Sequence, residues 1–296
     1  MVRVSGPDGV LIVDKPGGKT SHDVVAQARR LFGTRAVGHA GTLDPMATGV
    51  LLLLFGEATK LSPFLTADDK RYRAEITLGR STDTFDAEGE ITEERVVPAL
   101  EQSAVLAALS LEHSRSEQVP PSFSAIKVDG QRAHRLSRQG RPPELPPRPV
   151  TVHSLELVAL DTTTLALEMS VSKGYFVRSL ARDLCSSLGV PGHLSALRRL
   201  ASGTFKLEEA RPWPPPDTDL LSLSEAAARC LPVEKLRAES VANARQGKKL
   251  SQGDFETAGA SAGPTAWLDP AGVLVAIGAR EGDVYRVVRG FNLSAS

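Results

Sequence analysis

Three features are scarce in this 296-residue chain, and each scarcity excludes a class of protein. Cysteine occurs only twice, as Cys185 and Cys230, without C-x-x-C spacing. The pair offers neither a zinc site nor a disulfide framework, and spare thiols are typical of a reducing cytosol. The longest purely apolar run, residues 50–55, is far too short to cross a bilayer, and the N-terminus lacks the features of a signal peptide. We therefore expect a cytoplasmic protein that makes no contact with a membrane.

An excess of charge is also absent, because 35 Lys and Arg residues balance 35 Asp and Glu residues. A neutral chain argues against a nucleic-acid partner, which usually draws a basic surface. The charges are nevertheless segregated, since basic residues flank residues 38–60 on both sides and an acidic stretch follows at residues 83–94. One basic face is enough to contact phosphates, because that contact depends on the face and not on the total charge.

Hydrophobic periodicity predicts both helices and strands. Strand patterns occur at residues 11–15, 72–78, 150–160 and 165–171, and helical patterns at residues 20–33, 99–109, 176–188 and 223–230. Thr20 and Asp23 match a capping box, and Leu31 and Phe32 are expected on the buried face of the helix that follows. Because the strands pair locally instead of alternating with helices, the predicted class is α+β and not a doubly wound fold.

The chain changes character near residue 233. Before that point, residues 120–149 are rich in Pro, Arg and Gly and predict a long exposed excursion with a short helix near residues 132–138. After it, short strand-like segments separated by Gly-rich turns recur at the spacing of a small β-barrel. These segments are residues 247–250, 265–268, 273–277 and 284–288. The length is consistent with a main domain of residues 1–232 and an appendage of residues 233–296.

Residues 38–60 place one aspartate, Asp44, between a polar turn and the aliphatic run. Gly41 and Gly49 bracket the turn, and Pro45 pushes Asp44 towards an extended conformation. The pattern has two interpretations. Asp-Pro flanked by Gly and Thr is ordinary turn chemistry, in which Asp caps its own backbone. Alternatively, the turn holds a reactive carboxylate still at the end of a buried strand.

The complete string G-T-L-D-P-M-A-T-G, residues 41–49, resembles the catalytic segment of the TruB-type pseudouridine synthases. Further blocks that resemble the family occur in the family's order: D-K-P from Asp14 and residues 69–89, 120–130, 172–179 and 197–200. Ordered blocks over most of the chain favour the reactive interpretation of Asp44.

The resemblance implies a tRNA pseudouridine synthase that isomerises uridine-55 in the T loop. The reaction detaches uracil from C1′, turns it and rejoins it through C5, which is redox-neutral and implies neither a cofactor nor a metal. The family fold is a mixed, largely antiparallel central sheet flanked by helices, followed by a PUA-like RNA-binding barrel. Residues 1–232 would form the catalytic domain, residues 120–149 would grip RNA, and residues 233–296 would form the barrel. The T arm of tRNA is the expected partner of a monomeric enzyme.

Three residues match the family's catalytic positions. Asp44 matches the essential carboxylate, and the sequence leaves open whether it attacks C1′ or C6 or assists deprotonation at C2′. Tyr72 matches the tyrosine that stacks on the flipped base, although an aromatic in the core at the start of a strand is the alternative. Arg178 matches the arginine that pairs with Asp44, although an exposed arginine on a helix is the alternative.

Five further residues match positions expected near the substrate. His39 would stack on the flipped nucleotide or fill space beside it, and Phe176 and Leu197 would line the pocket. Lys15 and Lys60 would contact RNA or support the structure, with ordinary surface charge as the alternative.

One departure from the family pattern affects the pocket. Residues 172–179 read S-K-G-Y-F-V-R-S, whereas the family usually has S-K-G-T-Y-I-R-T. Phe176 thus replaces a tyrosine, and Tyr175 lies one position earlier. Adjacent residues of an extended chain face opposite sides, so Tyr175 should not substitute. Either the ring alone is needed at Phe176, which we favour, or the local register differs.

Other functions remain to be weighed against this one. A hydrolase of glycosidic bonds would need a second carboxylate facing Asp44, for which Asp86 and Asp183 are the candidates. A non-catalytic RNA-folding factor would keep the fold without the activity, which the intact Asp44, Tyr72 and Arg178 argue against. A T-loop-like hairpin of another RNA is the alternative substrate.

Overall fold

A nine-stranded mixed sheet forms the centre of the protein, whose computed structural model describes residues 6–128, 130–257, 261 and 263–292. Its strands are β1 (Gly9–Lys15), β2 (Val37–Ala40), β3 (Thr48–Phe55), β4 (Lys70–Leu78), β11 (Val152–Leu160), β12 (Thr164–Val171), β13 (Gly192–Ser202), β14 (Phe205–Lys206) and β15 (Arg211–Pro212). The main path runs β11-β12-β4-β13-β3-β1-β15, while β2 pairs with β3 and β14 with β13. Within this sheet the pairs β1–β15 and β13–β3 are parallel and the other strand pairs are antiparallel, which confirms the predicted class.

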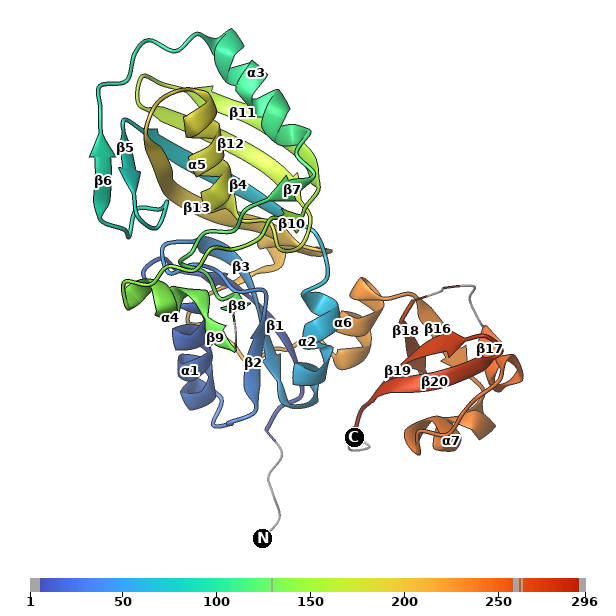
Figure 1. Ribbon diagram of the computed structural model, residues 1–296. Coiled ribbons are helices and arrows are strands. Elements are labelled where there is room, and N and C mark those ends of the chain that lie inside the picture. The colour runs from blue at the N-terminus through green and yellow to red at the C-terminus, as the bar shows by residue number, and fades with distance from the viewer. Residues whose placement is uncertain (1–5, 129, 258–260, 262, 293–296) are drawn as a thin grey trace.

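The central sheet has two halves, each with its own helices (Figure 1). The helices concerned are α1 (Ser21–Leu31), α3 (Gln102–His113) and α5 (Val177–Ser187). Helices α3 and α5 lie beside β4, β11, β12 and β13, whereas α1 lies beside β1, β2 and β3. The halves meet where Arg198 and Arg199 of β13 face Thr48 and Gly49 of β3. Gly49 has φ of 100°, and a Cβ there would lie 2.2 Å from the Arg199 carbonyl oxygen, so this close contact requires glycine.

Helix α1 begins as the sequence predicted, but only one of the two apolar residues expected to be buried at its end meets the core. The Asp23 N–H donates to Thr20 Oγ1 at 3.0 Å, and the Thr20 N–H donates to Asp23 Oδ2 at 2.9 Å, forming the expected capping box. The expected burial of Leu31 is wrong, since this residue is 52% exposed. Phe32, the C-cap of the helix, packs against Phe55 at 4.5 Å between ring centroids, in line with its expected place on the buried face.

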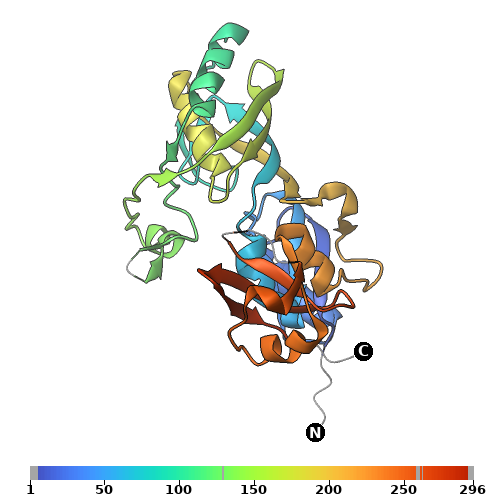
Figure 2. The ribbon, with the colours of Figure 1, turned by 90° about the vertical axis from the view of Figure 1, so that its right-hand side faces the viewer.

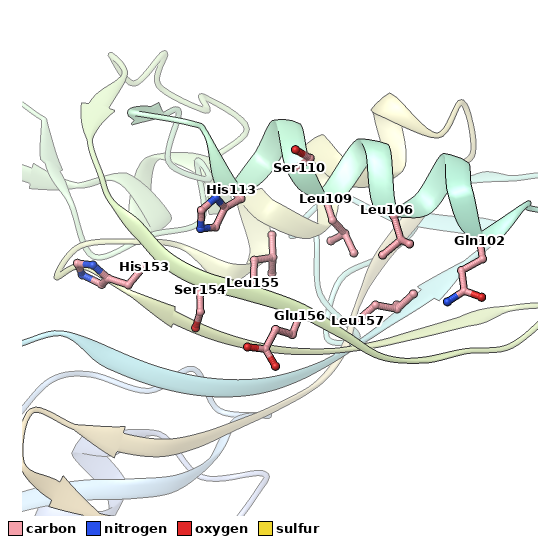
Figure 3. A pocket seen from close by; sticks show the side chains of 10 residues that line it. All are labelled: Gln102, Leu106, Leu109, Ser110, His113, His153, Ser154, Leu155, Glu156 and Leu157. Carbon is pink, nitrogen blue, oxygen red and sulfur yellow. The ribbon is translucent and has the colours of Figure 1, made fainter.

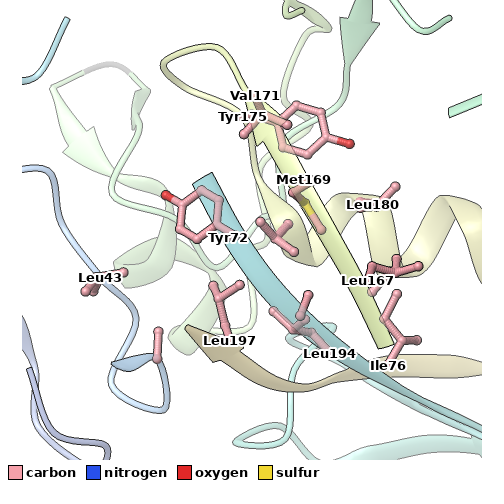
Figure 4. Packing of buried hydrophobic residues seen from close by; sticks show 14 of the residues in the cluster. Leu43, Tyr72, Ile76, Leu167, Met169, Val171, Tyr175, Leu180, Leu194 and Leu197 are labelled. Atoms are coloured by element: carbon pink, nitrogen blue, oxygen red, sulfur yellow. The ribbon is translucent and has the colours of Figure 1, made fainter. Parts of the chain in front are cut away.

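Apolar side chains cover both faces of β1 and β3, which explains the uninterrupted aliphatic run. Leu51 and Leu53 belong to one cluster, whereas Leu52 and Leu54 point to the opposite face and belong to another. The first cluster includes side chains of α1, α3 and α5. Figure 4 shows its part around Leu180 of α5. The second reaches helix α6 (Leu223–Cys230) and the C-terminal sheet, so apolar packing joins that sheet to the rest of the protein.

The C-terminal segment forms a five-stranded sheet and not the closed barrel that the sequence predicted. Its strands are β16 (Val233–Leu236), β17 (Phe255–Thr257), β18 (Thr265–Leu268), β19 (Leu274–Glu281) and β20 (Val284–Gly290). The order β17-β16-β18-β19-β20 leaves two edges among the described residues. Residues 247–250, expected as a strand, form only a single bridge from Leu250 to Tyr285. Lys248 and Lys249 are exposed, so this segment has too little apolar surface to bury as a strand.

Residues 120–149 leave the body of the protein between two short paired strands, β7 (Glu117–Gln118) and β10 (Arg148–Pro149). Within the described part of this excursion are β8 (Lys127–Val128), β9 (Gln131–Arg132) and the predicted short helix, α4 (Ala133–Arg138). Figure 2 shows the excursion projecting from the main body. The acidic stretch forms a hairpin of β5 (Arg80–Thr82) and β6 (Ile91–Glu94). In the described part of the chain, no helix has the length and apolar character needed to span a membrane.

Candidate active site

Asp44 lies on a turn, residues 41–48, whose backbone is held by hydrogen bonds from two sides. We call these residues the Asp44 turn. The Leu43 N–H donates to Ser21 Oγ at 2.9 Å, and Ser21 Oγ donates to the Leu43 carbonyl at 3.2 Å. The Gly18 N–H donates to the Pro45 carbonyl at 2.9 Å. Leu43 is buried, whereas the Asp44 side chain is 34% exposed, so the turn presents its carboxylate from a fixed backbone.

Two buried cations bond to carbonyls of the Asp44 turn. Lys15 has no exposed surface, and its Nζ donates to the Pro45 carbonyl at 3.1 Å as well as to two carbonyls of its own loop. Burial lowers the pKa of Lys15 to about 8, against the opposing attraction of Glu88 and Asp44. Lys15 therefore supports the structure in this state, which was one of the roles expected for it.

Arg199, the second buried cation, was not singled out by the sequence. It is 1% exposed and donates through Nε to the Val50 carbonyl at 2.7 Å, through Nη2 to the Gly41 carbonyl at 2.8 Å and through Nη1 to the Thr42 carbonyl at 3.4 Å. The L-R-R-L block at residues 197–200 was the available signal. Neither periodicity nor charge says which of its two arginines is buried.

Arg178 brings the other half of the central sheet to Asp44. It lies in the first turn of α5, and its side chain is only 6% exposed. Nε lies 2.9 Å from Asp44 Oδ2, and Nη2 donates to Asp44 Oδ1 at 3.2 Å. Contact with both carboxylate oxygens fixes the orientation of the group. The alternative, an exposed arginine on a helix surface, is excluded by this burial.

The same guanidinium joins two further segments. Nη1 donates to the Thr84 carbonyl at 3.2 Å and lies 3.5 Å from Asp86 Oδ2, while Nη2 donates to the Phe123 carbonyl at 3.0 Å. Arg178 is thus the meeting point of the Asp44 turn, the acidic hairpin and the excursion.

The carboxylates considered for a hydrolase have other partners. Asp86 is 3% exposed, and its Oδ1 accepts hydrogen bonds from Thr84 Oγ1 at 2.7 Å and the Glu88 N–H at 3.0 Å. Asp183 Oδ1 accepts from Arg182 Nε at 2.7 Å. A general acid must instead present a proton to the substrate. Both carboxylates act as acceptors here, which argues against that role.

Tyr72 and Leu197 lie at the end of the apolar cluster nearest to Leu43 (Figure 4). Tyr72 is 9% exposed and stands in β4 between Met169 and Arg199 of the neighbouring strands. Its register partner Arg199 also bonds to the Asp44 turn, so β13 links the two. The tyrosine is both part of the core and adjacent to the site, so the two expectations for it are compatible.

His39, in β2, is placed as a neutral ring just before the Asp44 turn. Burial, with the nearby His22 and Arg199, lowers the pKa of His39 to about 4. Its ring packs edge-on against His22 at 5.2 Å between centroids. A group that is neutral at physiological pH is consistent with stacking or space filling and not with acid–base work.

Phe176 and Tyr175 occupy different environments. Phe176 is the N-cap of α5, and its backbone bonds to the side chain of Gln118. Tyr175 is 8% exposed and packs in the apolar cluster, with its hydroxyl directed away from Tyr72 (Figure 4). Burial raises its pKa. Tyr175 therefore does not take the place of the tyrosine that Phe176 replaces.

Lys60 bonds to a different part of the protein. Its Nζ lies 2.6 Å from Glu57 Oε2 and donates to the Gly290 carbonyl at 3.1 Å. Glu57 also accepts from the Asn292 N–H at 2.7 Å, so the pair ties the segment after β3 to the end of the C-terminal sheet. Among the described residues, no group of His, Cys, Asp and Glu side chains is arranged to hold a metal ion.

A hollow of about 660 Å³ lies elsewhere, between α3 and β11 (Figure 3). Its lining includes Leu106, Leu109, Leu155 and Leu157 and shares no residue with the Asp44 site. The residues around Asp44 therefore do not line this cavity but lie at the junction of the two halves of the central sheet.

Comparison with known proteins is consistent with this geometry. A model of the N-terminal domain of the TruB family pseudouridylate synthases matches residues 29–177. The protein named tRNA pseudouridine synthase B from Thermobifida fusca (strain YX) is 44% identical over 280 residues, covering 91% of this chain and 94% of its own. The protein of that name from Arthrobacter sp. (strain FB24) is 41% identical over 280 residues, covering 91% and 92%.

Solved structures show the same fold. A Cbf5-Nop10-Gar1 complex contains a chain that aligns with a TM-score of 0.74 at 24% identity, covering 95% of this chain and 84% of the other. An H/ACA RNP bound to a substrate RNA contains one with a TM-score of 0.72 at 22% identity, covering 96% and 85%. The fold is that of the pseudouridine synthases. The two sequence matches each cover 91% of this chain. The chain belongs to the TruB family of pseudouridylate synthases.

Proposed function

We propose that this protein isomerises uridine-55 in the T loop of tRNA to pseudouridine, with Asp44 as the reacting carboxylate. The observation that carries the proposal is the contact of Arg178 with both oxygens of Asp44, a partly exposed carboxylate on a rigid turn. In the reaction the N1–C1′ bond breaks, a C1′–C5 bond forms, C5 loses a proton and N1 gains one. A carboxylate can stabilise positive charge at C1′ or form a covalent adduct, so one fixed aspartate suffices.

The other residues hold the flipped base and the turn. A uridine must leave its stack to reach Asp44, and aromatic rings receive such bases. Tyr72 stacks on the base, and Phe176, Leu197 and His39 complete the pocket. An uncharged His39 packs against a base without the cost of burying a cation.

Both lysines support the site and its surroundings. Lys15 holds the Pro45 carbonyl and sets the position of the Asp44 turn. Lys60 bonds to the C-terminal segment, and its side chain remains 30% exposed. Through this exposed part it contacts RNA.

The two outlying parts bind the rest of the tRNA. The excursion, residues 120–149, carries six Lys and Arg residues against two acidic ones and grips the T arm. Residues 1–232 form the catalytic domain, and residues 233–296 act as a PUA-like RNA-binding domain. Because Asp44, Tyr72 and Arg178 all come from one chain, we infer that the monomer is the active form. The isomerisation is redox-neutral and requires no cofactor. We place the enzyme in the cytoplasm.

A T-loop-like hairpin in another RNA is the second candidate substrate. RNA loops are recognised by shape and splayed bases, and the same site would accept any uridine presented in that shape. Mapping modified positions in total RNA from cells with and without the protein separates the two substrates.

The direct test compares wild type with Asp44→Asn on an unmodified tRNA transcript, followed by mapping of pseudouridine. The wild type should modify position 55, and the variant should lose activity by at least about 1,000-fold while remaining folded. Full activity of Asp44→Asn, or an unchanged T-loop uridine with wild type, contradicts the proposal. Release of free uracil would indicate a hydrolase instead.

A further inference from the structure

A buried glutamine at the base of the excursion bonds to the start of α5. Gln118, the last residue of β7, is only 2% exposed. Its Nε2 donates to the Phe176 carbonyl at 3.1 Å, and its Oε1 accepts from the Phe176 N–H at 2.8 Å. A buried amide that uses both of its polar groups on one residue holds that backbone in one orientation, as a pair of ladder hydrogen bonds does.

The residue that Gln118 holds sets the first turn of α5. Phe176 is the N-cap and has no side-chain cap of its own. Its carbonyl also accepts the N–H groups of Ser179 and Leu180 at 3.1 and 3.2 Å. Arg178 lies within this turn, so a rotation of the Phe176 backbone would redirect its guanidinium.

Further bonds join the base of the excursion, at Val119, and its first residues to α5. Ser179 Oγ and Arg182 Nη2 donate to the Val119 carbonyl at 2.8 and 3.1 Å. Arg178 Nη2 donates to the Phe123 carbonyl at 3.0 Å. The start of the excursion therefore lies along the N-terminal turn of α5 as a bonded unit, and Arg178 connects that unit to Asp44.

We propose that Gln118 is a positioning residue that couples the excursion to the reacting carboxylate. It fixes the N-terminal turn of α5 against the base of the excursion, so that Arg178 keeps Asp44 oriented while residues 120–149 hold RNA. This inference rests on the proposed roles of Asp44, Arg178 and the excursion. Because Gln118 is buried and bonds to backbone, its loss should slow the chemical step without weakening RNA binding.

The test replaces Gln118 with methionine, which has a similar length but can make neither bond. With saturating unmodified tRNA transcript, Gln118→Met should lower the single-turnover rate constant about 10- to 100-fold, since two buried hydrogen bonds and the alignment of Arg178 are lost. The dissociation constant for the tRNA should stay within about threefold. The matched control is Gln102→Met, the same change on the exposed surface of α3, which should react at the wild-type rate.

A second variant tests the same unit with a smaller change. Ser179→Ala removes one bond to the Val119 carbonyl and should lower the same rate constant about two- to fivefold, again at unchanged RNA affinity. If Gln118→Met does not fold, Ser179→Ala alone tests whether the bonds between the base of the excursion and α5 affect the rate constant. A wild-type rate in folded Gln118→Met, or a loss accounted for by weaker RNA binding, overturns the inference. That outcome is distinct from failure of the proposed function, which would appear as an active Asp44→Asn.

Discussion

The Asp44 turn and the excursion use positive charge in opposite ways. At the turn, Lys15 and Arg199 are buried and bond to backbone carbonyls. In the excursion, the basic side chains of the described residues are exposed: Lys127, Arg132, Arg135, Arg138, Arg141 and Arg148. A buried cation holds the backbone in place because no water can replace the carbonyls as its hydrogen-bond partners. An exposed cation can move with a flexible phosphate chain.

The two regions also differ in how they are attached. The Asp44 turn sits at the junction of the two halves of the central sheet, where Gly49 contacts the backbone of Arg199 too closely for any side chain. The excursion is joined to the body by the two register pairs of β7 and β10 and by bonds to α5. A reacting carboxylate requires a fixed position, while a surface that grips RNA benefits from freedom to adjust. Arg178 contacts both regions and is where the two requirements meet.

The largest effect is expected from removing the buried cation of the turn. Arg199→Met would leave the Gly41 and Val50 carbonyls without their partner, lowering the free energy of unfolding by about 3–5 kcal/mol. The displaced turn should lower activity at least about 100-fold. Urea denaturation and pseudouridine assays on the folded fraction measure both. Arg198→Met is the matched control, because Arg198 is 40% exposed and pairs with Asp14, and it should cost about 1 kcal/mol or less.

A wild-type stability of Arg199→Met would show that the turn holds itself without a buried cation. The contrast between the two regions would then rest on packing alone.

The next effect concerns the ring at the junction of the two regions. Phe176→Ala should lower activity about 10- to 100-fold, since stacking on a base contributes about 1–3 kcal/mol. Phe176→Tyr keeps the ring and should remain active. Rate constants under saturating tRNA distinguish these variants, and equal activity of the alanine variant would contradict a pocket-lining role.

Neutralising the excursion should change affinity without changing stability. The double variant Arg135→Gln/Arg138→Gln should raise the dissociation constant for tRNA about tenfold near 0.1 M salt and make its logarithmic salt dependence shallower by about 1.5. Filter binding over a salt series measures both. The pair Arg80→Gln/Arg95→Gln, whose arginines contact Glu94 and Glu93 of the acidic hairpin, is the control and should leave the slope unchanged. An unchanged slope in the excursion variant would remove its assigned role.

The smallest effect is a pH dependence of stability beside the Asp44 turn. The folded pKa of His39 is about 4, below its usual 6.5, so between these values the unfolded chain binds a proton that the folded chain does not. The contribution of neutral His39 to the free energy of unfolding is therefore complete above pH 6.5 and is lost as pH falls towards 4. After allowance for partial exposure, His39→Gln should remove about 1–2 kcal/mol of this dependence. Urea denaturation at pH 4.5 and 6.5 measures this difference. An equal change in the free energy of unfolding between the two pH values for variant and wild type would contradict the prediction.

Local features of the sequence predicted local structure well. The alternation of residues 72–78 predicted β4, and Thr20 and Asp23 predicted the start of α1. The prediction of a strand at residues 247–250 was wrong because three of the four residues have no apolar side chain to bury. Leu31 failed because helical periodicity cannot tell which of two neighbouring residues at a helix end meets the core.

What the sequence by itself determined is the set of elements and the string around Asp44, because periodicity, caps and turns depend on neighbouring residues. Only the tertiary structure decided that Arg199 and not Arg198 is buried, that Lys60 meets the C-terminal segment, and that Gln118 holds Phe176. The Arg178–Asp44 contact spans 134 positions along the chain, so the resemblance could suggest it but no local pattern could. Such contacts depend on how the two halves of the sheet pack, which is the sum of many distant apolar contacts and not a property of any one segment.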